Sequence, residues 1–191
     1  MPNTVVAFGF RPVKEPDPSS LLTVTALASY ATALFVGDAV IPGGTADPIY
    51  GYPTVTRSLA GSTNVMGIIV GFERLDPDST SLATKNPGAA STLRYIKIAP
   101  TFQSTVFECM ANASTDVTAV GNGFDIDATA GSAVTGFSGM GLDVSTIATT
   151  LTTLRLLSLI NRPDNDFASA QTGIKCHVFF AESLWNNGPG V

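Results

Sequence analysis

Short apolar runs separated by turn residues recur along most of this chain. Residues 22–27 alternate apolar and polar side chains with a period of two, which predicts a half-buried β-strand. Residues 65–73 form a strongly apolar run, in which Gly67 and Gly71 indicate a bulge or a close approach of neighbouring backbone. Apolar runs of the same kind predict further strands at residues 34–36, 39–41, 93–99, 105–110, 154–160 and 174–180.

This spacing of strands is typical of an all-β protein. About eight short strands occur without alternating helices, and no segment repeats with a fixed period. We therefore expect a single β-barrel or β-sandwich of the jelly-roll or β-tulip kind, with an extended N-terminal arm and at most one or two short helices. The β domain should span residues 21–185 and be followed by a loose C-terminal tail at residues 186–191.

Several stretches interrupt the strand pattern. The sequence Pro42-Gly43-Gly44 predicts a break, and residues 75–91 predict a loop. Residues 111–141 are rich in Gly, Ala, Ser and Thr and form either part of the domain or a separate small lobe. Residues 143–151 fit the start of a short helix, although their threonines argue against a long one.

Residues 1–20 have the composition of an extended arm. They include four prolines, which exclude a helix and interrupt the hydrogen-bond ladder of a sheet. The arm also carries Phe8 and Phe10, whose exposure to water would cost about 1.5–3 kcal/mol each. These rings should therefore dock, either on the arm's own domain or on a neighbouring subunit.

Charge is scarce in this chain of 191 residues. Asp, Glu, Lys and Arg make up 13% of the residues, against about 25% in ordinary soluble proteins. The net charge is −5 and the ten Lys and Arg residues form no cluster, which argues against direct binding of nucleic acid or of an anionic membrane. We expect neither a membrane-spanning helix nor a signal peptide. A weakly charged surface favours a protein that is covered by partner proteins.

The single histidine offers little for catalysis. His177 lies in a predicted strand, and its neighbour Cys176 points to the opposite face, so these two residues cannot form a nucleophile–base pair. No G-x-S-x-G elbow accompanies them. Glu73 and Glu108 are the strand acids that could form a glycosidase pair, although solvated or ion-paired acids are far commoner. We therefore expect a protein that is not an enzyme and has no catalytic residues.

Metal and cofactor sites are not predicted either. One histidine and two distant cysteines, Cys109 and Cys176, do not make a zinc set. Both cysteines occur in apolar runs, where a reduced and buried thiol acts as a small hydrophobe. The acidic loops at residues 76–78 and 164–166 could bind Ca²⁺, but they lack the EF-hand spacing, and such residues more often form Asx-turns.

Several motifs taken together resemble a known family. In chain order they are Phe8-Gly9-Phe10-Arg11-Pro12-Val13, Phe35-Val36-Gly37-Asp38-Ala39-Val40, Gly67-Ile68-Ile69-Val70-Gly71-Phe72, Thr105-Val106-Phe107-Glu108, Thr135-Gly136-Phe137-Ser138-Gly139, Leu154-Arg155-Leu156-Leu157-Ser158-Leu159 and Arg162-Pro163-Asp164-Asn165. In this order they span most of the chain, and they resemble the head decoration (cement) proteins of tailed bacteriophages, particularly those of short-tailed phages.

The resemblance implies a structural virion protein that is assembled in the host cytoplasm and lies on the capsid exterior. Its partners would be the major capsid protein and further copies of itself, as a homotrimer in preference to a homodimer. It would bridge neighbouring capsomers and stabilise the shell by mass action. An aromatic arm suits such a task, because it can pair with a sheet edge and anchor its rings in pockets. The residues expected at the interface are Phe8, Phe10, Arg11, Pro12 and Trp185.

Other classes remain open. A head–tail connector, tail-tube or fibre-base protein could share the fold, but a tail-tube protein should form rings and a connector should occupy one vertex. A carbohydrate-binding β module would usually present solvent-facing Trp and Tyr side chains, whereas this chain has one Trp and four Tyr. A small β-barrel enzyme is the remaining alternative.

Overall fold

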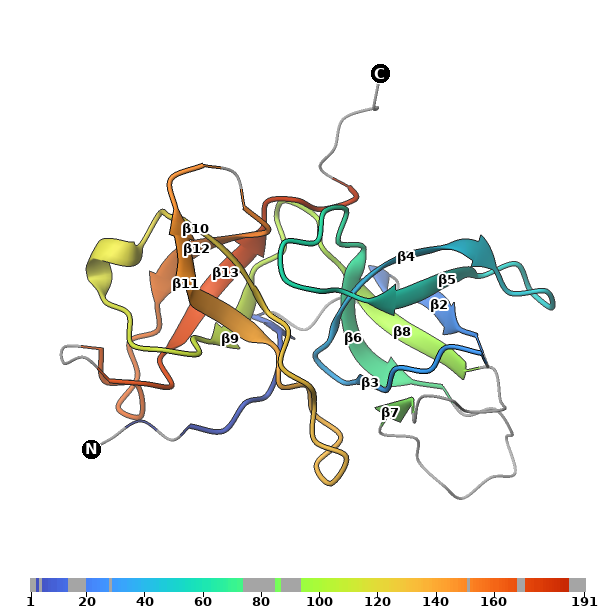
Figure 1. Cartoon of the computed structure of the whole chain (residues 1–191), viewed down its shortest axis with the longest axis horizontal. Helices are drawn as coiled ribbons and strands as arrows, with labels where there is room; N and C mark the ends of the chain where they lie inside the picture. The colour runs from blue at the N-terminus through green and yellow to red at the C-terminus, as the bar shows by residue number, and fades with distance from the viewer. Residues whose placement is uncertain are drawn as a thin grey trace.

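The computed structural model contains two large β-sheets that lie side by side (Figure 1) and a small two-stranded sheet. It describes residue 3 and residues 5–13, 20–27, 29–73, 85–86, 94–150, 152–167 and 171–185. One sheet is a closed barrel in the order β2-β5-β4-β6-β8, and the other has six strands in the order β1-β9-β13-β12-β10-β11. The prediction of an all-β fold is confirmed. The second sheet beside the barrel was not predicted.

Most of the strands are short. Their bounds are β1 (Arg11–Pro12), β2 (Leu22–Ala26), β3 (Leu34–Phe35), β4 (Ala39–Ala46), β5 (Pro53–Arg57), β6 (Gly67–Phe72), β7 (Lys85–Asn86), β8 (Arg94–Pro100), β9 (Phe107–Met110), β10 (Gly123–Asp127), β11 (Gly141–Ala148), β12 (Leu154–Leu159) and β13 (Lys175–Phe180). A 3₁₀ helix, η2 (Val117–Ala119), precedes β10. Strands β3 and β7 form a separate antiparallel pair.

Alternating side chains fill the barrel. In β2 and β8 the buried positions Val24, Ala26, Ile96 and Ile98 point inward and join one apolar cluster. The barrel closes because β2 pairs with β8 on one side and, in parallel, with β5 on the other.

Strand β6 confirms the prediction made for its glycines. A Cβ atom on Gly67 would lie 2.8 Å from the carbonyl oxygen of Ala99, so the backbones of β6 and β8 approach too closely for a side chain. A register shift between Ile69 and Gly71 marks a β-bulge. Close packing therefore requires glycine at position 67, whereas a Cβ atom on Gly71 would meet nothing within 4 Å.

A second apolar cluster joins the six-stranded sheet to the barrel. Phe107, Val178 and Phe180 of the sheet belong to the same buried cluster as Ala39 and Ile68 of the barrel. The two sheets therefore share a core and pack against each other. Burial alternates along β13, and the predicted orientation of Cys176 into the core and of His177 toward the other face is confirmed.

Two sequence predictions fail where pairing outweighs local preference. Residues 143–148 lie in strand β11 instead of starting a helix, because β10 supplies an antiparallel partner for these Thr, Ser and Ile side chains. Residues 42–44 continue β4 instead of breaking it. Strand β4 pairs with β6 only at Ala39 and Val40, and beyond these residues it pairs with β5 alone. Its other edge is free there, and a free strand edge tolerates proline and glycine.

The stretches predicted to be loop or lobe also contribute strands. Of residues 75–91, only residues 85–86 are described, and they form β7. Residues 111–141 contribute η2 and β10, and β10 lies between β11 and β12 in the six-stranded sheet. Most of the predicted loop, including the acidic residues 76–78, lies outside the described residues, as does the predicted tail at residues 186–191.

The arm joins the six-stranded sheet at its edge. Arg11 and Pro12 form β1, which pairs with Glu108 and Phe107 of β9. The backbone N–H of Val13 donates to the carbonyl of Val106 at 3.0 Å. The prediction that the prolines prevent sheet pairing is therefore wrong at Pro12, because an edge strand leaves one side of its backbone free.

Candidate interaction surfaces

The first candidate surface lies where the arm crosses the barrel. The guanidinium of Arg11 lies over the ring of Phe8, 4.4 Å from its centroid, which is cation–π geometry. These residues and Pro12 line a pocket of about 200 Å³ together with Phe137 from the loop between β10 and β11. Phe137 is 48% exposed. We call the surface formed by Phe8, Arg11, Pro12 and Phe137 the arm pocket.

Phe10 also borders this pocket, but its ring belongs to the core. It is 2% exposed and packs edge-on against Phe180, with the ring centroids 5.2 Å apart. Its backbone N–H donates to the carbonyl of Gly37 at 2.9 Å. The ring of Phe10 therefore docks on its own domain, which is one of the two alternatives that the sequence left open for the rings of the arm.

Trp185 forms the second candidate surface, together with Phe102. Their ring centroids are 5.5 Å apart, and Trp185 is 39% exposed. The indole N–H of Trp185 donates to the carbonyl of Met66 at 2.7 Å, so the ring is held against the barrel with one face outward. We call this pair the tryptophan patch.

The third candidate surface was missed by sequence reasoning. Tyr50 and Tyr52 lie at the tip of the β4–β5 hairpin, which projects from the barrel (Figure 1), and Tyr95 lies on β8. Every pair of these rings is in contact, with centroids 5.8–5.9 Å apart. Tyr50 is 68% exposed and Tyr52 is 37% exposed. We call these residues the tyrosine cluster.

Asp47 holds the hairpin turn in place beneath the cluster. Its carboxylate accepts hydrogen bonds from the backbone N–H groups of Ile49 and Tyr50, at 3.1 and 2.8 Å. The hydroxyl of Tyr95 donates to the same carboxylate at 3.4 Å. Burial and the neighbouring Asp47 raise the pKa of Tyr95, so its hydroxyl remains a donor. The sequence signal was the Tyr50-Gly51-Tyr52 turn, but nothing local connects it with Tyr95.

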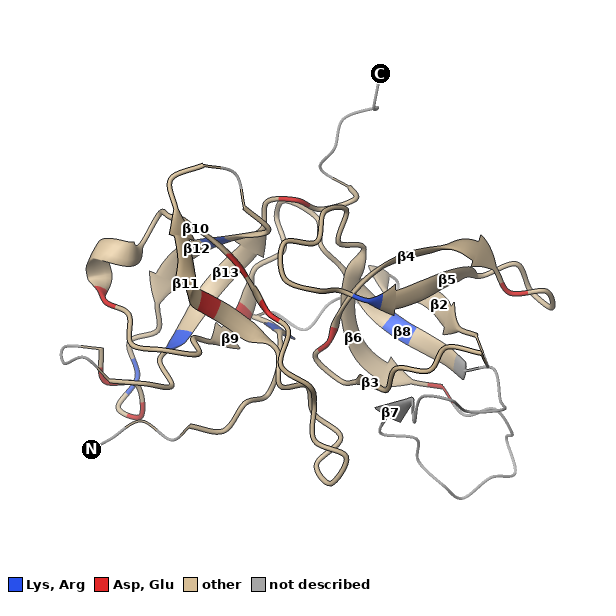
Figure 2. Ribbon diagram, in the orientation of Figure 1, with Lys and Arg blue, Asp and Glu red and all other residues tan. Residues whose placement is uncertain are grey.

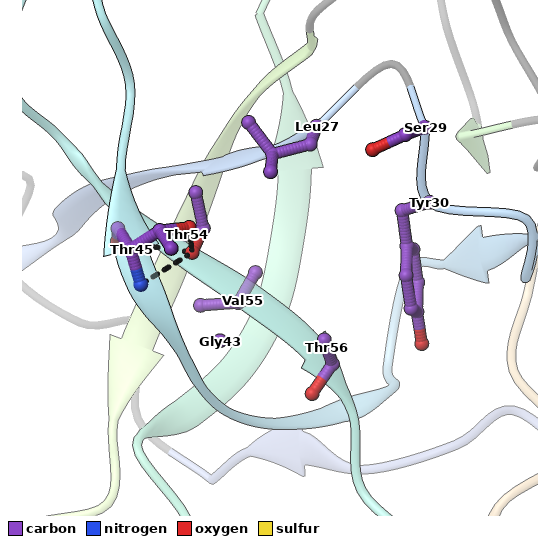
Figure 3. A pocket seen from close by; sticks show the side chains of 8 residues that line it. All are labelled: Leu27, Ser29, Tyr30, Gly43, Thr45, Thr54, Val55 and Thr56. Atoms are coloured by element: carbon purple, nitrogen blue, oxygen red, sulfur yellow. Dashed lines mark hydrogen bonds between the residues drawn. The ribbon is translucent and has the colours of Figure 1, made fainter.

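A small pocket opens beside the same hairpin. Figure 3 shows it lined by Thr45, Thr54 and Thr56, with Leu27 and Tyr30 opposite. The hydroxyl groups of Thr45 and Thr54 bond each other at 2.8 Å. Its volume of about 160 Å³ is below the roughly 300 Å³ at which small-molecule pockets begin.

A row of polar residues crosses the outer face of the six-stranded sheet. Arg11, Glu108, His177 and Ser158 are neighbours in register on β1, β9, β13 and β12. Ser158 Oγ lies 3.1 Å from Nδ1 of His177. In a serine triad the serine bonds Nε2 and the acid bonds Nδ1, so this geometry differs from a triad. Glu108 forms an ion pair with Arg162.

The two glutamates considered for glycoside hydrolysis do not lie together. Glu108 belongs to β9 of the six-stranded sheet, whereas Glu73 follows β6 of the barrel. Glu73 is paired with Lys97, whose Nζ lies 2.8 Å from its Oε1. Each acid therefore has its own cation, and the two do not form a pair.

The acidic loop at residues 164–166 uses its side chains within the fold. Asp164 pairs with Lys175 and Arg162, and the hydrogen bond from Lys175 lowers the pKa of Asp164. The Asn165 amide donates to the carbonyl groups of Ile160 and Lys175, both at 2.8 Å. Among the described residues, no group of three or more His, Cys, Asp or Glu could hold a metal ion.

Figure 2 shows that charged residues are spread along the ribbons of both large sheets. The most buried charge is Asp38, which follows β3. It accepts hydrogen bonds from the backbone N–H of Phe35 at 2.9 Å and from the Ser138 hydroxyl at 2.5 Å, and Nε of Arg57 lies 3.6 Å away. Burial raises the pKa of Asp38 even though these partners lower it.

No protein-family model, curated protein or solved structure matches this chain. Within the part of the chain that the structure describes, no helix has the length and apolar character needed to cross a membrane.

Proposed function

We propose that this protein is a structural virion component that binds the outer surface of a tailed-phage capsid shell and bridges neighbouring capsomers. The observation that carries this proposal is the presence of two separate exposed aromatic surfaces, the arm pocket and the tryptophan patch. Large aromatic side chains that remain partly exposed are typical contact residues at protein interfaces. A bridging protein needs two such surfaces, whereas an enzyme or a simple binding module needs one site.

The placement of these surfaces suits bridging. The arm pocket is formed by the arm and the β10–β11 loop, and the tryptophan patch is formed by residues that follow β8 and β13, so the two surfaces share no residue. Two separate contacts would allow one molecule to touch two neighbouring subunits. Once one contact has formed, the second surface is held at a high effective concentration near its own partner. The overall affinity is then higher than that of either contact alone, even where each contact is weak.

The low charge of the chain supports the same proposal. With 13% charged residues, the free protein has little electrostatic protection against association. The order of motifs resembles that of the cement proteins of tailed phages, and this resemblance implies that the partner is the major capsid protein. Because a cement binds the assembled shell and not the dissociated subunits, binding would stabilise the shell.

The test uses empty shells assembled from the major capsid protein encoded in the same genome. The purified protein should co-sediment with these shells at high copy number and raise their melting temperature in calorimetry. Phe137→Ala and Trp185→Ala should each weaken co-sedimentation, while Ile147→Ala, at an exposed position on β11, serves as the control. Absence of binding, or binding at one vertex only, would contradict the proposal. Rings of the free protein would indicate a tail-tube protein instead.

A further inference from the structure

The tyrosine cluster continues into a polar surface on the outside of the barrel. Tyr95 and Lys97 are two residues apart on β8, so both side chains point outward, opposite to Ile96 and Ile98 inside the barrel. Nζ of Lys97 lies 2.8 Å from Glu73 and 2.5 Å from the hydroxyl of Thr23. Aromatic rings, a neutralised ion pair and a hydroxyl group therefore adjoin on one face.

This face is preorganised. Asp47 is buried and holds the hairpin turn through two backbone N–H groups, as well as the hydroxyl of Tyr95. Each tyrosine ring contacts the other two. Little conformational freedom remains to be lost when a ligand binds, which favours affinity from a small contact area.

The exposed aromatic area is sufficient for a sugar ring. A tyrosine side chain buries about 150–250 Å² at most, so rings exposed by 68% and 37% offer roughly 150–260 Å². Ile49, beside Tyr50, is 67% exposed and adds apolar surface next to the rings. Taken alone, the area of the two rings is well below the roughly 800 Å² that each partner covers in a stable protein complex.

The chemistry of the face matches a sugar ring. The C–H face of a pyranose packs on an aromatic ring, while its hydroxyl groups need donors and acceptors close by. The tyrosine hydroxyls, Lys97 and Glu73 provide both. The ion pair is neutral overall and the chain carries a net charge of −5, so an anionic polysaccharide would be disfavoured. The rings are tilted by 42°, 60° and 78° to one another, which suits a single soluble chain and not a flat crystalline surface.

We propose that the face formed by Tyr50, Tyr52, Tyr95, Lys97 and Glu73 is a binding site for a neutral pyranose oligosaccharide. This inference does not depend on the proposed capsid role, because the arm pocket and the tryptophan patch share no residue with this face. A molecule with both activities would attach to a shell with one set of residues and to a glycan with another.

The test uses the full chain and three defined probes, cellohexaose, chitohexaose and maltohexaose. Binding is followed by saturation-transfer NMR and by titration of tyrosine absorbance. At least one of the three should bind, and Tyr50→Ala should weaken that binding about tenfold or more. Tyr50→Phe keeps the ring and should retain binding within about threefold, because ring contact contributes more than the hydroxyl.

Two further variants make the test specific. Tyr52→Ala repeats the loss at a second ring, so the result does not rest on one substitution. Ile147→Ala removes an exposed apolar side chain elsewhere and should bind like the unchanged protein. Melting temperatures confirm that each variant is folded. No binding of any of the three probes, or binding that survives both tyrosine substitutions, overturns the proposal. Binding of a proline-rich peptide at this face in place of the sugars also overturns it.

Discussion

Cys109 and Cys176 lie directly opposite each other on the antiparallel strands β9 and β13, with their sulfur atoms 3.6 Å apart. Both are free thiols and both are buried in the core between the two sheets. Burial, and next the neighbouring thiol, raise the pKa of Cys109 well above its ordinary value of 9.0. Cys109 is therefore a neutral thiol, and both buried side chains pack as small apolar groups, as the sequence predicted for each cysteine separately.

We expect neither thiol to react in the folded protein. Alkylation requires a thiolate that the reagent can reach, and both requirements fail for a buried, neutral thiol. Iodoacetamide followed by mass spectrometry should find two unmodified cysteines in the native protein and two modified ones in concentrated urea. Val134→Cys provides the control, because residue 134 is 96% exposed and should be labelled at once. Equal rates for the native thiols and the control would contradict this packing.

The two phenylalanines of the arm should respond differently to truncation. Phe10→Ala removes a buried ring from contact with Phe180 and should lower the free energy of unfolding by about 3–5 kcal/mol. Phe8 is half-buried at the arm pocket, so Phe8→Ala should cost less than about 1.5 kcal/mol. Urea denaturation measures both.

The same variants separate the structural role of the arm from its proposed contact role. If the arm pocket binds the shell, Phe8→Ala weakens co-sedimentation with capsids while the melting temperature changes little. Similar stability losses for Phe8→Ala and Phe10→Ala, with capsid binding unchanged, would show that the arm serves only its own fold.

Gly37 and Gly9 mark the point where the arm crosses the barrel. Gly37 has φ +92°, and a Cβ atom there would lie 2.8 Å from the carbonyl oxygen of Phe8. We expect Gly37→Ala to lower the free energy of unfolding by about 3 kcal/mol or more, from backbone strain together with crowding. Gly44 also has a positive φ, of +79°, but nothing lies within 4 Å of the place that a Cβ atom would take there, so Gly44→Ala should lose only about 1–2 kcal/mol. Equal losses in urea denaturation would show that the crossing is not tight.

Asp38 should make stability fall as the pH rises. Burial raises the pKa of Asp38 above its ordinary value of 3.8, so the folded protein binds this proton more tightly than the unfolded chain. Its contribution is therefore fully present below pH 3.8 and is lost as the pH rises through the folded pKa. The difference in unfolding free energy between the unchanged protein and Asp38→Asn should fall as the pH rises above 3.8.

Asp116 provides a control of opposite sign. Its hydrogen bonds from Thr118 lower the pKa of the Asp116 carboxyl. Its contribution is therefore present above its ordinary pKa of 3.8 and is lost as the pH falls. In the same urea titrations, the difference in unfolding free energy between the unchanged protein and Asp116→Asn should be small, and it should rise with pH instead of falling. A slope of the same sign for both variants would contradict the assigned directions.

Strands with strong local signals could be predicted from the sequence, and strands made by pairing could not. Strand β13 alternates buried and half-buried side chains, and β6 is an unbroken apolar run. A few residues are therefore enough to identify each of them as a strand. Strand β11 mixes apolar residues with Gly, Asp, Ser and Thr and lacks a strict alternation, and it becomes a strand because β10 lies beside it. Local composition cannot anticipate such a neighbour.

The candidate surfaces divide in the same way. The sequence pointed to Phe8, Arg11, Pro12 and Trp185, because aromatic and proline-rich segments at the ends of a chain are conspicuous. It did not distinguish the half-buried Phe8 from the buried Phe10, because that difference depends on the packing of Phe10 against Phe180 of β13. Nor did it bring Tyr95 to Tyr50 and Tyr52, because that contact depends on how the β4–β5 hairpin lies against β8.

The sequence by itself determined the β class, the scarcity of charge, and the opposite orientations of Cys176 and His177. These properties follow from composition and from the alternation of side chains along a strand, which are local. Only the tertiary structure decided that the strands divide into a barrel and a second sheet, that Phe10 lies in the core between them, and that three tyrosines meet on one face. These outcomes depend on which strands pair across long stretches of chain, and that choice is made by the shared burial of apolar faces.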